Sequence, residues 1–260
     1  MTELIRNVPV QDALDEWAVE RNNQTFGRVL SRALVGELLL DISASQLADP
    51  ANGFRQGDML AIASQVDNAG KRLLVTYTDN ERLAAVNGEN ARSLGQPAVA
   101  VLQQAIIDYD GIVIDPGHAG VFIAYTDELR RGVGRDPMTA ARIATDLTER
   151  RRPVREVLDE IAAAPVYIAA EVIRSATGEV QGVRVQLATG ADGVTLSPVF
   201  TTPAQVWAWA PTLEARETRL ANVAGVALDD GHAGIIIDPA GPSLTLPADA
   251  LPELARGERA

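Results

Sequence analysis

The six residues GIVIDP at positions 111–116 return as GIIIDP at positions 234–239. Each copy predicts a short buried strand, because an apolar run between Gly and Asp-Pro fits a strand covered on both faces, and the proline ends the ladder. The step of 123 residues between the copies also carries Thr76-Tyr77-Thr78 onto Val199-Phe200-Thr201. A step that persists over about a hundred residues indicates an internal duplication.

The duplication extends to the elements before these strands. Apolar residues at helical spacing predict an amphipathic helix in each half, followed by an apolar strand and by a hairpin with an Asn/Asp/Gly turn. The predicted equivalents are helices 26–34 and 154–162, strands 38–40 and 166–168, strands 59–66 and 183–189, and strands 71–76 and 194–199.

A second helix is predicted after each hairpin. Thr78 with Glu81, and Thr202 with Gln205, have the spacing of a capping box. Trp207 lies on the second of these helices but away from its apolar face. We therefore expect Trp207 to be an exposed aromatic residue.

Length and duplication together predict the fold class. The 260 residues suit two domains rather than one small core. We expect an α+β protein with two tandem homologous domains, residues 1–133 and 134–260, each with a mixed β-sheet of about five strands and flanking helices. The two halves are expected to pack as an internal pseudo-dimer in a monomer, or the chain to form a homodimer.

Composition narrows the classes of function. The net charge of -12 disfavours nucleic acid and anionic lipid as partners. The absence of cysteine removes disulfides and thiolate chemistry, and it fits a reducing compartment. The N-terminus has neither a basic segment nor an apolar core, and no apolar run is long enough to span a membrane. We expect a cytoplasmic protein without a membrane association and without a cofactor.

The two histidines, His118 and His232, both lie in the tetrapeptide Gly-His-Ala-Gly. With Asp115 and Asp230 nearby, they are candidates for a ligand-binding site or a general base. The alternative is that the histidines are exposed turn residues and that the aspartates end strands and form turns. Neither stretch has the ligand spacing of a hard-cation loop, so no metal site is predicted.

A basic zone and a tryptophan are the candidates for binding a protein partner. Arg150, Arg151 and Arg152 are part of a basic zone in an otherwise acidic chain, and Trp207 is a candidate aromatic anchor. The alternative for the arginines is a solvated face that pairs with the surplus carboxylates. For Trp207 the alternative is a place in the core.

Four segments resemble the SseB family, named for an enhanced serine sensitivity phenotype. The second half carries VFTTPAQVWAW at 199–209 and GIIIDPAGPSLTLP at 234–247, and the first half carries the more divergent LLVTYTDNERLAAV at 73–86 and GIVIDPGHAGVFI at 111–123. Both halves resemble the N-terminal type of domain in that family. The resemblance implies no established enzymatic activity and no catalytic residues.

We therefore expect a non-catalytic cytoplasmic adaptor or regulatory protein that binds a protein partner. A second hypothesis is a small-molecule or metal-binding protein, including a hydrolase, that uses the two Gly-His-Ala-Gly loops. A third is a structural component whose acidic surface confers solubility.

Overall fold

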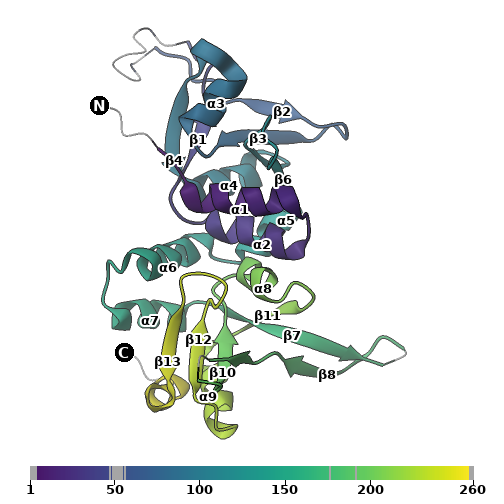
Figure 1. Cartoon of the computed structure of the whole chain (residues 1–260), viewed down its shortest axis with the longest axis vertical. Coiled ribbons are helices and arrows are strands. Elements are labelled where there is room, and N and C mark those ends of the chain that lie inside the picture. Colours follow the sequence, from purple (N-terminus) through teal and green to yellow (C-terminus); the bar gives the residue numbers. More distant parts are fainter. Residues whose placement is uncertain are drawn as a thin grey trace. The chain divides into compact units, whose positions relative to one another are not determined.

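The structure is a computed structural model that describes residues 5–46, 48, 55, 57–175, 177–190 and 192–257 (Figure 1). The chain divides into two compact units, one formed by Met1–Arg21 and Val35–Arg130 and the other by Asn22–Leu34 and Arg131–Ala260. Residues 22–34 thus pack with the second unit, although in the sequence they lie between the two segments that form the first unit. The boundary between residues 133 and 134 stays a prediction.

The first unit is built on one mixed sheet with the strand order β4-β1-β3-β5-β6, and β2 pairs with β3 beside this path. Only β3 and β5 run parallel, with Leu74 beside Ile112 and Thr76 beside Ile114. In chain order the elements are α1 (Val8–Val19), β1 (Glu37–Asp41), β2 (Ser64–Val66), β3 (Arg72–Tyr77), α3 (Asn80–Asn87), the 3-10 helix η2 (Gly88–Asn90), β4 (Ser93–Pro97), α4 (Ala98–Asp108), β5 (Gly111–Ile114), β6 (Phe122–Tyr125) and α5 (Thr126–Val133), which ends in the second unit.

The second unit has two sheets, β13-β12-β10-β9 and β11-β7-β8. Its elements are α2 (Asn23–Arg32), α6 (Pro137–Glu149), α7 (Val154–Ala163), β7 (Val166–Arg174), β8 (Val180–Val185), β9 (Ala188–Thr189), β10 (Thr195–Val199), α8 (Pro203–Trp209), β11 (Glu214–Thr218), α9 (Leu220–Asp229), β12 (Gly234–Ile237), β13 (Leu244–Pro247), the 3-10 helix η3 (Ala248–Ala250) and α10 (Leu251–Ala255).

Two backbone hydrogen bonds join the sheets of the second unit. Tyr167 N donates to Phe200 O at 2.8 Å, and Phe200 N donates to Tyr167 O at 2.9 Å. The same contact in the first unit is the pair Leu39 and Tyr77 between β1 and β3. The strand order β4-β1-β3-β5-β6 therefore recurs as β11-β7-β10-β12-β13, which confirms the predicted α+β class with two copies of one fold.

The repeated strands β5 and β12 need their first glycine. A Cβ atom on Gly111 would lie 2.4 Å from Ala124 O, and one on Gly234 would lie 2.1 Å from Leu246 O, both far inside van der Waals contact. The apolar residues that follow are almost all buried, as expected for strands covered on both faces.

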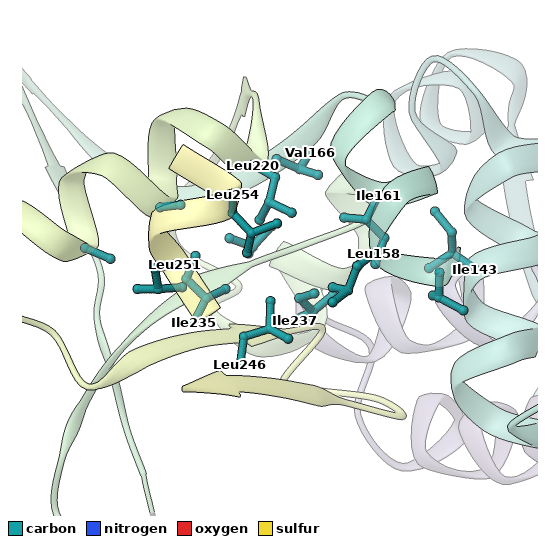
Figure 2. Close-up of a cluster of buried hydrophobic side chains, with 14 residues drawn as sticks. Ile143, Leu158, Ile161, Val166, Leu220, Ile235, Ile237, Leu246, Leu251 and Leu254 are labelled. Carbon is teal, nitrogen blue, oxygen red and sulfur yellow. The ribbon is translucent and has the colours of Figure 1, made fainter. Parts of the chain in front are cut away.

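Helices cover the sheet of the second unit and close its main core. Side chains from α7, α9 and α10 meet those of β10, β12 and β13, and Ile161, Leu220 and Ile237 are fully buried there (Figure 2). A smaller cluster on the other face contains Tyr167, Phe200 and Val206. The predicted helix 154–162 is thus confirmed as α7, with Val157, Leu158 and Ile161 in the core and Val154 exposed.

Two local predictions need correction. The first residue of the capping motif before α3 is Asp79, whose side chain accepts from Arg82 N, because Thr78 is engaged by Asp115. The predicted strand 183–189 is also divided. Its first part belongs to β8, which pairs with β7, and only Ala188–Thr189 pairs with β10.

Candidate functional site

The two aspartates that end the repeated strands hold the backbone of the neighbouring strand. Asp115 and Asp238 adopt left-handed backbone angles, with φ of 53° and 48°. Asp238 accepts from Thr201 N at 2.8 Å and from Thr201 Oγ1 at 2.6 Å. Asp115 makes the equivalent bonds to Thr78, at 2.8 and 2.7 Å. Both carboxylates are buried. We call each aspartate, together with the threonine whose N–H and hydroxyl it binds, a clamp, and Asp115 therefore has a structural role.

The two clamps differ in electrostatics. In the first unit, Arg82 Nη1 lies 2.5 Å from Asp115 Oδ2. In the second unit the equivalent position is Gln205, and burial, which outweighs the two hydrogen bonds from Thr201, raises the pKa of Asp238 to about 6. Gln205 Oε1 is the buried side-chain atom that lacks a hydrogen-bond partner within the described part of the chain.

The first unit has a cleft of about 450 Å³ beside α3, which we call the α3 cleft. Its lining includes Arg6, Gln11, Asp79, Arg82 and His118. Gln11 connects part of it, accepting from Arg6 Nε at 3.1 Å and donating to Asp79 Oδ2 at 2.5 Å. The cleft therefore combines cationic donors with two carboxylates, that of Asp79, which is already hydrogen-bonded, and that of Glu81.

His118 lies at the rim of the α3 cleft in the exposed loop after β5. Its Nδ1 accepts a hydrogen bond from Gly120 N at 3.3 Å, so in the neutral ring the proton is on Nε2. The second histidine, His232, belongs to the other unit and precedes β12.

His232 lies in a largely apolar cleft of about 330 Å³ between the sheet of the second unit and α9, which we call the α9 cleft. Its Nδ1 is 2.8 Å from Ser197 Oγ. Asp230 lines the same cleft, so this half of the predicted set is brought together. The apolar part of the lining includes Val185, Leu187, Val223 and Val226.

The α9 cleft continues into an exposed apolar face of β8. Val183 pairs with Val172 and Val185 pairs with Ala170, so all four side chains share one face. A shift of register next to Arg174 pairs that residue with Val180 and so adds Val180 to the same face. We call Val172, Val180, Val183 and Val185 the β8 face. Three of them are exposed: Val180 at 53%, Val183 at 44% and Val185 at 38%.

Trp207 is not the exposed aromatic that the sequence predicts. Its ring is half-buried and lies 6.4 Å from the ring of Phe26 on α2, measured between centroids. Gly27 allows this approach, since a Cβ atom there would lie 2.9 Å from Trp207 Cβ. The reason is tertiary: α2 packs along α8 and covers the side of the helix that the repeat pattern leaves open.

The arginines of the predicted basic zone directly follow α6, with Arg150 as its C-cap. Arg152 is ion-paired with Asp146 and Glu160, and hydrogen bonds to Asp146 and then Glu160 raise its pKa. Arg151 is ion-paired with Glu149. Arg150 ends α6 in the left-handed conformation and is exposed. These contacts favour the alternative of a face that pairs with nearby carboxylates.

Ser197 and the β8 face are not among the sites predicted from the sequence. Part of the face lies in the predicted hairpin strand 183–189, and the segment VQGVRV at 180–185 shows its alternating valines. Nothing in the segment itself shows that its apolar side stays uncovered. Ser197 carries no local signal, because its partner His232 is 35 residues away.

Within the described ranges, no group of three or more His, Cys, Asp or Glu side chains is arranged to hold a metal ion. The helices in the same ranges are all too short or too polar to cross a membrane.

Comparisons with known proteins agree with the duplicated fold. A family model described as the SseB protein N-terminal domain matches twice, at residues 10–129 and 142–253. No curated protein and no solved structure matches. The two matches fall on the two sets of equivalent strands described above, and the chain therefore belongs to the SseB family, with two tandem copies of its N-terminal domain.

Proposed function

We propose that this chain is a non-catalytic adaptor or regulatory protein, and that a protein partner binds to the second unit over the β8 face and the α9 cleft. The observation that carries the proposal is the continuity of these two features through Val185, which belongs to both. An exposed apolar patch that continues into a cleft is typical of an interaction surface.

The packing of the second unit explains why this surface is available. Val223 and Val226 of α9 line the cleft on the helix side, and Val226 is 57% exposed. Figure 1 shows the β7–β8 ribbon extending away from β10, β12 and β13 of its own unit. The helix layer therefore ends where the ribbon continues, and the valines of the ribbon stay in contact with solvent.

The polar groups of the α9 cleft support binding rather than catalysis. Ser197 lies within β10, is 5% exposed and is followed by Pro198, which has no N–H to stabilise an oxyanion. Its hydroxyl is hydrogen-bonded to His232 Nδ1, a contact that can also activate a serine, so it is the burial of Ser197 and the lack of an N–H on Pro198 that favour binding.

The experiment compares two valine variants in a quantitative pull-down from lysate of the source organism. Val183→Glu puts a charge on the β8 face, and Val66→Glu puts the same charge on an edge strand of the first unit, where Val66 is 67% exposed. We expect Val183→Glu to lose a stoichiometric partner that the wild type and Val66→Glu retain. Equal retention by all three proteins would reject the proposal.

A second candidate function is binding of a small molecule in the α3 cleft. The observation that favours it is the convergence of Arg6, Arg82 and His118 on a cleft at the carboxyl ends of the parallel strands β3 and β5. His118→Ala removes a side chain at the rim that has no role in the core. If the cleft binds a metabolite, this variant loses the thermal shift that the metabolite causes in the wild type.

A further inference from the structure

We infer that the partner binds as an extended segment that adds a strand to the free edge of β8, with apolar residues at alternate positions and a basic residue beside the α9 cleft. The inference rests on the proposed function and specifies the chemistry of the partner.

The edge of β8 is open to main-chain pairing. Among the described residues, β8 pairs only with β7. Gln186 N donates to Ala169 O at 3.0 Å, so that pair is hydrogen-bonded, and such pairs alternate along an antiparallel ladder. Arg184 and Glu171 therefore form the next hydrogen-bonded pair, whereas the N–H and C=O groups of Val183 and Val185 point to the free edge.

An added strand would extend the β8 face. Its residues opposite Val183 and Val185 would direct their side chains to the same side as these valines. Val185 also lines the α9 cleft, so one side chain of the added strand lies within reach of the cleft. This is the arrangement of strand addition, in which main-chain bonds provide affinity and pockets for alternate side chains provide specificity.

Charge defines the remaining feature of the segment. Arg184 is ion-paired with Glu171 at 2.9 Å, and Arg174 is ion-paired with Glu214 at 3.8 Å. Both arginines of the β7–β8 ribbon therefore already have a carboxylate partner. Asp230 lines the cleft and has no ion pair within the described residues. A basic side chain would pair with it. The net charge of -12 favours a basic segment over a second copy of this chain.

The test uses a random 12-residue peptide library displayed on phage and selected against the full chain. We expect selected peptides to share alternating apolar residues and one Lys or Arg. Synthetic peptides would then be titrated by fluorescence anisotropy into wild type, Val183→Pro and Val183→Thr. Val183→Pro removes an edge N–H and is expected to weaken binding at least about tenfold, whereas Val183→Thr retains that N–H and is expected to change it by less than about threefold.

Two further measurements do not depend on the folding of the proline variant. Hydrogen exchange should show peptide-dependent protection of the Val183 and Val185 amides in the wild type. Asp230→Asn should reduce the preference for the basic residue over a neutral one by about fivefold or more, since it removes the facing charge.

Several results would overturn the inference. These are selection of no peptide, selection of helical or acidic peptides, no protection at β8, or a dimer of this chain in which the β8 amides are protected without peptide. Each of them leaves the proposed function standing if Val183→Glu still loses its partner in the lysate. The proposed function fails separately if that variant retains every partner.

Discussion

Arg82 donates from Nη1 to Asp115 Oδ2 at 2.5 Å, and the second copy of the fold has Gln205 in place of that arginine. Both copies keep the aspartate and the two bonds that it accepts from a threonine. The second copy buries the carboxylate without an ion pair among the described residues, and burial raises the pKa of Asp238 to about 6. The duplicated clamp thus exists in a form with an ion pair and a form without one.

Asp238 is expected to make the stability of the second unit depend on pH. Its pKa is about 6 in the folded state and about 3.9 in an unfolded chain. The folded state therefore holds the proton more tightly, so the stabilising contribution is complete below the unfolded pKa and is lost as pH rises to the folded pKa. The contribution of this group to the free energy of unfolding should fall by about 2 kcal/mol between pH 4 and pH 7.

Denaturant titrations over that pH range check this expectation, with Asp238→Asn as the comparison. The asparagine variant has no titrating group at this position and should lack the Asp238 part of the slope. A slope that is the same in both proteins would show that the pKa of Asp238 does not differ between the folded and unfolded states.

Arg82→Gln is expected to give the first copy the environment of the second. It leaves Asp115 buried without its cation, which should lower the free energy of unfolding by about 3 kcal/mol at pH 7 and by less at pH 4, where the carboxylate takes up a proton. Denaturant titrations at the two pH values measure the difference. An equal loss at both would mean that Arg82 acts through packing alone.

Gln205→Arg is the reverse change. If the arginine reaches Asp238 as Arg82 reaches Asp115, the pKa of Asp238 should fall below 6, since an adjacent cation favours the carboxylate. Carboxyl-carbon NMR titration of Asp238 measures the shift directly. An unchanged pKa would show that the second site holds its residue 205 in a different position.

Two glycine variants should have opposite effects on stability. Gly111→Ala places a Cβ atom 2.4 Å from Ala124 O between β5 and β6, and it should destabilise the first unit by about 1–3 kcal/mol. Gly225→Ala is the matched control in α9, where a Cβ atom meets nothing within 4 Å, and it should stabilise by about 0.5–1 kcal/mol. Thermal unfolding of the two variants would contradict this account if both shift in the same direction.

Trp207→Ala is expected to reduce stability rather than to remove a partner selectively. It deletes the ring that packs against Phe26, and a loss of about 2–4 kcal/mol is expected for a half-buried aromatic side chain. The melting temperature and the lysate pull-down should be measured on the same preparation. A variant with an unchanged melting temperature and a lost partner would restore Trp207 as a partner-binding residue.

The sequence by itself determined the duplication and the order of most elements, because these depend on local patterns. Apolar runs between Gly and Asp-Pro specify β5 and β12, and helical spacing specifies α2 and α7. Gln205 is visible as the counterpart of Arg82 once the repeat is aligned. The N-cap of α3 was misplaced by one residue, since nothing local shows that Thr78 is held by Asp115, 37 positions away.

Only the tertiary structure decided which apolar faces are covered. Trp207 is half-buried because α2 packs on α8, and Val183 is exposed because β8 pairs with β7 and extends beyond α9. Both outcomes depend on contacts between segments that are distant in sequence. The spacing of apolar residues in the sequence predicts that a face is apolar. Whether another element covers that face depends on the packing of the whole unit.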